Sequence, residues 1–238
     1  MSTTIHTDDR TLSSPRARSD ARRAAGALTL ASVLAIAGFS VLGSVFEYPQ
    51  ILDEPTADVL ALFREHESTV RTWFALLAVG SALMAPAGIW LGRLAGRPLG
   101  RWIAGLGIAA ATVQVIGLQR WVTLVPGISH DALDPSLRAD AEDRFELLHL
   151  VLGKAIGETL GYALTAAFTV LVVIALRRVG LLPTWLAVGG FVSAGLIATG
   201  VVIPVIEPAS LTNFAGYVVW CAWLIAVAVV LFQAGRRR

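Results

Sequence analysis

The chain has 238 residues, of which 55% are hydrophobic and 15% charged, and its formal net charge is +2. Apolar runs of about 20 residues recur along it, and this length crosses the ~30 Å hydrocarbon core of a bilayer. The composition excludes a soluble globular domain and predicts an all-α fold, a polytopic membrane helical bundle. The small basic excess does not indicate a nucleic-acid partner, because the basic residues are spread over four separate patches.

Six transmembrane helices are predicted, and they divide the chain into three parts. The expected spans are residues 25–46, 72–94, 102–121, 148–176, 183–206 and 214–234. Residues 1–24 are expected to be a disordered basic cytoplasmic tail, because this segment is too polar to pack. Residues 25–235 then form the transmembrane domain, and residues 236–238 form a basic cytoplasmic C-terminus. Pro86 and Pro204 are expected to kink the second and fifth spans.

The arginines predict the orientation of these spans, because short cytoplasmic loops retain Lys and Arg. Thirteen arginines lie in the two tails and in the connections after the second and fourth spans, whereas five lie on the opposite side. Both termini are therefore predicted to be cytoplasmic, in a multi-pass protein of a bacterial plasma membrane. Tryptophans near the span ends, including Trp102 and Trp121, fit the aromatic belts of the two interfaces.

Two outer loops are predicted to contain helix. In the first, Pro55 starts a short amphipathic helix on the membrane surface, with Val59, Leu60 and Phe63 on one face. In the second, Asp134 is expected to cap a helix that has Pro135 at its first position. The fourth span would then begin outside the membrane and run inward without a break. These loops would either cover a site or merely connect the spans.

The fourth span carries the candidate functional site. Lys154, Glu158 and Tyr162 follow one another at helical spacing inside an apolar run. A charged side chain at this depth costs roughly 2.5 to 3.5 kcal/mol on insertion scales, so it usually faces a partner, a cavity or a substrate path. A second stripe, formed by Gly153, Gly157 and Gly161, is expected to let a partner helix approach closely.

Further polar residues of other segments are expected near this site. The predicted ligand-binding set is Lys154, Glu158, Tyr162, Arg120, His149, Glu47, Gln114, Asn213 and Tyr217. We favour an ion pair between Lys154 and Glu158; the alternative is that Lys154 extends to the outer interface and leaves Glu158 unpaired. The pair would belong either to a ligand, ion or proton site or to a structural salt bridge that fixes the helix.

Recognisable reaction chemistry is absent from the sequence. The single cysteine and the lack of a His or Cys pair at ligand spacing predict no metal, and no cofactor is expected. No protease, zinc-enzyme or phosphate-loop motif is present, which argues against an enzyme.

The leading hypothesis is a membrane protein that binds a small ligand or ion in an outward-facing pocket, with transport or sensing open. The alternatives are an enzyme with Glu158 or His149 as acid or base, and a structural or regulatory partner of another membrane protein. Membrane lipids are the other expected partners.

Several segments resemble a known family. They are FEYPQIL and EPTADVLALF after the first span, Arg120-Trp121 at the end of the third, GETLGY in the fourth and NFAGYVVW at the start of the sixth. Together they resemble the bacterial six-helix membrane proteins catalogued as domain of unknown function 4386. The resemblance implies an integral membrane protein with six spans and no assigned activity, so it supplies no site residues.

Overall fold

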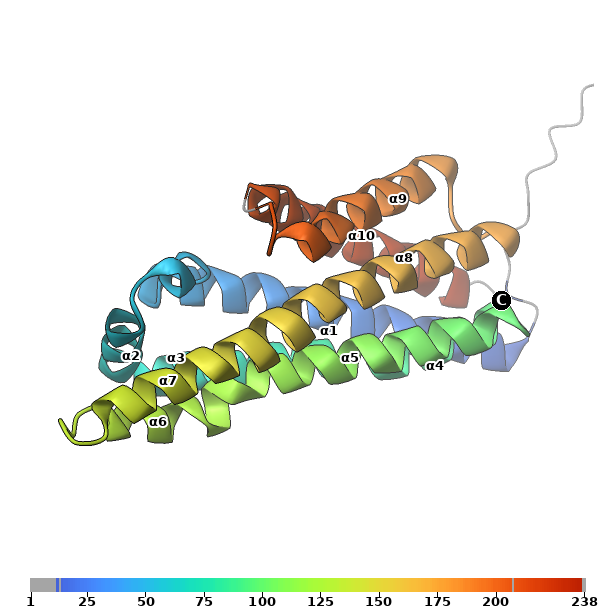
Figure 1. Cartoon of the computed structure of the whole chain (residues 1–238). Coiled ribbons are helices and arrows are strands. Elements are labelled where there is room, and N and C mark those ends of the chain that lie inside the picture. Colours follow the sequence, from blue (N-terminus) through green and yellow to red (C-terminus); the bar gives the residue numbers. More distant parts are fainter. Residues whose placement is uncertain (1–11, 13, 207, 237–238) are drawn as a thin grey trace, which may run out of the picture.

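The computed structural model describes residues 12, 14–206 and 208–236, and every regular element in them is helical (Figure 1). The elements are α1 (Pro15–Val45), η1 (Gln50–Asp53), α2 (Thr56–Glu65), α3 (Glu67–Ala82), α4 (Met84–Ala95), α5 (Leu99–Thr123), α6 (Val125–Asp131), α7 (Arg138–Leu148), η2 (His149–Leu160), α8 (Gly161–Arg178), α9 (Thr184–Ala198), η3 (Thr199–Val202) and α10 (Ala209–Arg236). Six of the continuous helical stretches in this part are long and apolar enough to cross a membrane. The predicted all-α bundle of six spans is confirmed.

The helices run back and forth between two ends of the bundle (Figure 1). The start of α1, the α4–α5 and α8–α9 connections and the end of α10 lie at one end, here called the terminal end. The short helices α2, α6 and α7 lie at the other, here called the loop end. Helix α5 packs against α3, α4, α8 and η2, and α1 packs against α3, α4 and α10. Because of this arrangement, α5 is in contact with most of the helices that carry the predicted site residues.

The first helix begins earlier than predicted. The Ser14 hydroxyl accepts a hydrogen bond from the Ala17 amide at 3.1 Å, and Pro15 takes the first position, where its missing N–H costs nothing. Burial of Ala21 and Ala24 in the core stabilises these first turns of the helix. The prediction of a disordered tail is therefore wrong for residues 15–24, while residues 1–11 and 13 lie outside the described part of the chain.

The two prolines within the spans have different effects. Helix α3 ends at Ala82, four residues before Pro86, and α4 begins at Met84, two residues before it. This is the interruption expected from a proline, which cannot donate to the carbonyl four residues earlier. In the fifth span, η3 ends at Val202, so Pro204 follows the helix instead of kinking it.

Both outer loops contain the predicted helices, with two corrections. Helix α2 buries Val59, Leu60 and Phe63 as expected, but it packs against α6 and α7 rather than lying on the membrane surface. Helix α7 begins at Arg138 instead of Pro135. The reason is that an Asp134 carboxylate oxygen accepts hydrogen bonds from the Ser136 amide at 2.8 Å and from the Ser136 hydroxyl at 2.7 Å. These bonds hold a turn at Asp134–Ser136, and the helix begins only after it. From Arg138 the helical path to Arg178 is unbroken, as predicted.

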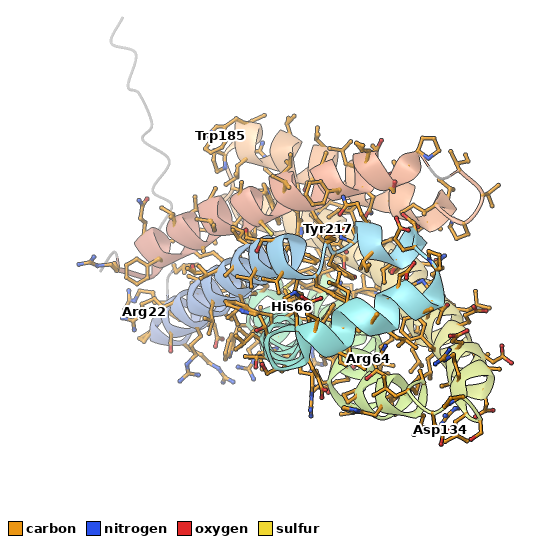
Figure 2. The ribbon with its side chains drawn as sticks, turned by 90° about the vertical axis from the view of Figure 1, so that its left-hand side faces the viewer. Arg22, Arg64, His66, Asp134, Trp185 and Tyr217 are labelled. Atoms are coloured by element: carbon orange, nitrogen blue, oxygen red, sulfur yellow. The ribbon has the colours of Figure 1, made fainter. Side chains whose placement is uncertain are left out.

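An aromatic cluster fills the core of the loop end. Trp121 is fully buried, and its indole ring packs against Phe46, Phe63, Phe74 and Phe145 at centroid distances of 5.1 to 5.9 Å. The placement of Trp121 in an interfacial belt is therefore wrong, because the loop helices cover it. Figure 2, which faces the loop end, shows α2 lying across the helices behind it and Asp134 at the outermost turn.

Candidate functional site

The candidate site lies where α5 crosses η2, a π-helical segment of 12 residues in the middle of the fourth span. The glycine stripe makes this crossing close. A Cβ atom built on Gly157 would lie 3.0 Å from the Gly117 Cα, and a Cβ atom on Gly117 would lie 2.7 Å from the Gly157 Cα. Gly161 faces the Gln114 side chain less closely, because a Cβ atom there would lie at an ordinary contact distance of 3.4 Å from the Gln114 Cγ. The stripe is therefore occupied by α5 of the same chain.

Arg120 lies one turn further along α5, toward the loop end, and its side chain fills the space above Gly153. A Cβ atom on Gly153 would lie 2.7 Å from the Arg120 Nη2 atom. The Arg120 side chain is only 4% exposed, and its Nη1 donates to the Gly117 carbonyl at 2.6 Å. The Nε and Nη2 atoms of Arg120 are buried and have no hydrogen-bond partner among the described residues. A buried cation with unmet donors is costly, and such groups call for a ligand, an ion or ordered water.

Three other ionisable side chains interact electrostatically with the Arg120 guanidinium. They are Tyr48, Glu158 and Tyr162. Burial raises the pKa of Tyr48 to about 12; the nearby Glu158 carboxylate acts in the same direction and Arg120 opposes it. Tyr48 follows the first span, Arg120 belongs to the third, and Glu158 and Tyr162 to the fourth. Two spans and the segment after the first span therefore contribute to one polar cluster.

The cluster continues into α10 through aromatic contacts. The rings of Tyr162 and Tyr217 meet edge to face at 5.7 Å, and Tyr217 meets Trp220 at 5.8 Å. Figure 2 shows Tyr217 lying among the helices, in contrast to Trp185, which lies at the outer edge of the bundle. Tyr217 is thus held from two sides, at the far end of the cluster from Arg120.

The favoured ion pair between Lys154 and Glu158 is not formed, which corrects that prediction. Lys154 is exposed, Glu158 is half-buried, and no ion pair within 4 Å joins them. The physical reason is the π-helix. Residues four apart stack in an α-helix, whereas a π-helix bonds residue i to i+5 and lengthens the turn, so the two side chains diverge. Glu158 interacts electrostatically with Arg120 and also, without an ion pair, with Lys154.

His149 and Glu47 lie at the margins of the site. The His149 ring stacks on Phe145 with a centroid distance of 6.1 Å, and both its nitrogens are buried without a hydrogen-bond partner among the described residues. Glu47 is exposed and has a positive φ of 51°, and its carbonyl accepts from the Ile51 amide at 3.0 Å. Glu47 therefore shapes the turn that brings Tyr48 to the cluster.

Gln114 and Asn213 have structural partners. The Gln114 side chain accepts from the Ser81 hydroxyl at 3.2 Å and donates to the Thr165 hydroxyl at 2.8 Å, so it links three spans. Asn213 donates to the Ile197 carbonyl at 2.7 Å and satisfies the end of α9. Both amides thus bond within the protein, whereas Arg120 Nε and Nη2 have no partner, and Glu158 makes no side-chain hydrogen bond, among the described residues.

Comparison with known families matches residues 24–228 to the family described as Domain of unknown function (DUF4386). The chain belongs to this family. The resemblance noted from the sequence is thereby confirmed over most of the chain. Comparison with curated proteins and with solved structures finds no match.

Sequence reasoning missed two groups in the site of this DUF4386 protein. Tyr48 stands beside Glu47 in the family-like segment FEYPQIL, yet nothing local to that segment shows that it reaches the third span. Trp121 was predicted to lie at an interface, but its indole ring is buried beside Arg120, with the guanidinium carbon 5.4 Å from the ring centre. The buried indole nitrogen has no hydrogen-bond partner within the described part of the chain. No hydrogen bond joins His149, Glu158 and Arg120 to one another, and the described residues contain no group of three His, Cys, Asp or Glu placed to hold a metal ion.

Proposed function

We propose that this membrane protein binds a small anionic ligand at Arg120. The observation that carries the proposal is the buried guanidinium, which uses one of its donors on the Gly117 carbonyl and has Nε and Nη2 without a partner in the described residues. A guanidinium presents its donors as a planar fork that matches a carboxylate or a phosphate. A ligand of that chemistry would satisfy both free donors and neutralise the buried charge.

The surroundings support a ligand with a second polar group. Glu158, Tyr48 and Tyr162 all interact electrostatically with the Arg120 guanidinium. A carboxylate beside an anion site repels a simple anion, but it attracts a ligand that carries an ammonium or hydroxyl group next to its acidic group. A small zwitterion such as an amino acid has this charge pattern, and it would use Arg120 and Glu158 together.

The arginine distribution supports a ligand that arrives from outside the cell. The terminal end carries the basic connections, so under the positive-inside rule it would face the cytoplasm, in keeping with the orientation predicted for a protein of a bacterial plasma membrane. Arg120 lies in the last turn of α5, which ends at the loop end. The site is then outward-facing, as the sequence predicts. Both a transporter and a sensor need this binding step.

Thermal unfolding of the full chain in neutral-lipid nanodiscs tests the proposal. The probes are small carboxylates, phosphates and amino acids, each added over a concentration series. At 100 times its Kd a ligand stabilises the folded state by about 2.7 kcal/mol, which is easily measured. The proposal predicts that at least one probe stabilises the wild type and fails to stabilise Arg120→Gln. The matched control is Arg71→Gln, which removes an exposed arginine near the loop end and should respond as the wild type does.

A second variant separates binding from folding. Gly153→Ala keeps the Arg120 charge but places a methyl group where the guanidinium lies, and the flexible arginine can move aside. We expect this variant to stay folded and to lose the ligand response. Stabilisation of Arg120→Gln and Gly153→Ala equal to that of the wild type would overturn the proposal.

A further inference from the structure

A second feature lies at the terminal end of the bundle, away from Arg120. The first turns of α1 and the connection between α4 and α5 enclose a groove of about 480 Å³. Four arginines line it: Arg16, Arg93, Arg97 and Arg101. These residues come from two segments separated by more than 70 positions in the sequence, and only the fold brings them together.

The charges in this groove are poorly balanced. Asp20 is the only acidic residue in its lining, is 3% exposed, and lies 3.5 Å from the Arg93 Nη1 atom. Arg16, Arg97 and Arg101 have no carboxylate within 4 Å among the described residues. Asp20 therefore positions Arg93, and three further positive charges surround the same space.

The residues next to the groove indicate its depth in the membrane. Trp102 follows Arg101 directly and is 68% exposed, as expected for a tryptophan at the membrane–water interface. The rest of the lining includes the apolar residues Ile89, one turn before Arg93 on α4, and Ala104, one turn after Arg101 on α5, so apolar groups lie deeper in the bundle than these two arginines. A cationic rim above an apolar wall matches the boundary between the headgroup and the acyl chains of a phospholipid.

From these observations we infer that the groove binds the phosphate headgroup of an anionic phospholipid. Arginine forks suit the phosphate oxygens, and the apolar wall suits the upper part of the acyl chains. The positive-inside rule explains why arginines occur at this end, but it requires no particular arrangement of them. Their convergence on one groove is the additional fact. This inference is independent of the ligand proposed at Arg120.

Lipid retention measured by native mass spectrometry tests the inference. The full chain is purified in detergent and titrated with phosphatidylglycerol, and phosphatidylcholine serves as the neutral reference. Each arginine near an anionic headgroup contributes about fivefold in affinity, so Arg97→Gln combined with Arg101→Gln should weaken phosphatidylglycerol binding about 25-fold. Binding of phosphatidylcholine should not change.

The matched control combines Arg23→Gln with Arg178→Gln. These two exposed arginines lie at the same end and outside the groove, so the net charge changes equally. An equal loss of phosphatidylglycerol binding in both double variants would overturn the inference and assign the attraction to the general surface charge. Arg16→Gln, on the opposite wall of the groove, should cause about a fivefold loss and checks the result if the double variant misfolds.

A soluble phosphate is the competing source of the same chemistry. Glycerol 3-phosphate is therefore added to the protein in phosphatidylcholine nanodiscs and followed by calorimetry. The inference predicts no saturable binding below millimolar concentration, because the apolar wall then contributes nothing. Micromolar binding of glycerol 3-phosphate without preferential retention of phosphatidylglycerol would overturn the lipid assignment.

Discussion

Substitution of Gly117 by alanine examines the helix crossing that supports the site. The new Cβ atom would lie 2.7 Å from the Gly157 Cα, whereas ordinary contacts begin at 3.4 Å. Helices α5 and η2 must therefore move apart by about 0.7 Å, and the obstacle is backbone, which cannot rotate away. Overpacking of this kind costs about 1 to 3 kcal/mol. For a chain of this length, a loss of about 2 kcal/mol lowers Tm by roughly 4 to 8 °C.

The control for this substitution is Gly105→Ala on the same helix. Nothing lies within 4 Å of the Cβ position at Gly105, and alanine is the better helix former by about 1 kcal/mol. Thermal unfolding of both variants in the same detergent should show a lower Tm for Gly117→Ala and an unchanged or higher Tm for Gly105→Ala. Equal Tm values would refute the close crossing of α5 and η2.

Three further outcomes are expected. Ultraviolet titration should show Tyr48 ionising near pH 12, because burial raises its pKa. The stability that its neutral form contributes is complete below about pH 10 and is lost as the pH rises through 12. A normal titration midpoint would place Tyr48 in water. Trp121→Ala should cost about 3 to 5 kcal/mol in chemical unfolding, because the indole is fully buried, while Trp102→Ala should cost far less. In a cysteine-free background, a cysteine at Thr56 should react with an impermeant maleimide from outside the cell and one at Gly96 should not; the reverse pattern contradicts the orientation.

The periodic features of the fold were predictable from the sequence. Each span is an apolar run of membrane length, and the face of α2 formed by Val59, Leu60 and Phe63 follows from their spacing after Pro55. These signals are local, because they depend on residues within one or two turns. The start of α1 also has a local signal, Ser14-Pro15, although the polar composition of the residues that follow favours disorder.

The predictions that failed depend either on a local backbone geometry that the residue pattern does not specify or on contacts between distant segments. The spacing of Lys154 and Glu158 implied a pair only under α-helical geometry, and the π-helix of η2 removed that assumption. Trp121 follows the interfacial pattern in sequence, yet α2 and α7 cover it in the fold. The unmet donors of Arg120 are likewise a property of its packing beside Gly153, which no local pattern specifies. The sequence alone therefore brought Arg120, Glu158 and Tyr162 forward as candidates, and that they bind a ligand stays a proposal. Their mutual arrangement, and the approach of Tyr48, depend on the fold.

The most direct test of anion binding at Arg120 is the small-molecule content of the purified protein. The wild type and Arg120→Gln are purified in parallel in a mild detergent, denatured, and the released molecules below lipid size are identified by mass spectrometry. Binding at the buried guanidinium predicts an acidic compound, in near-stoichiometric amount, that is released from the wild type and lacking in Arg120→Gln. The same compound in equal amount from both proteins would contradict the assignment of the site to Arg120.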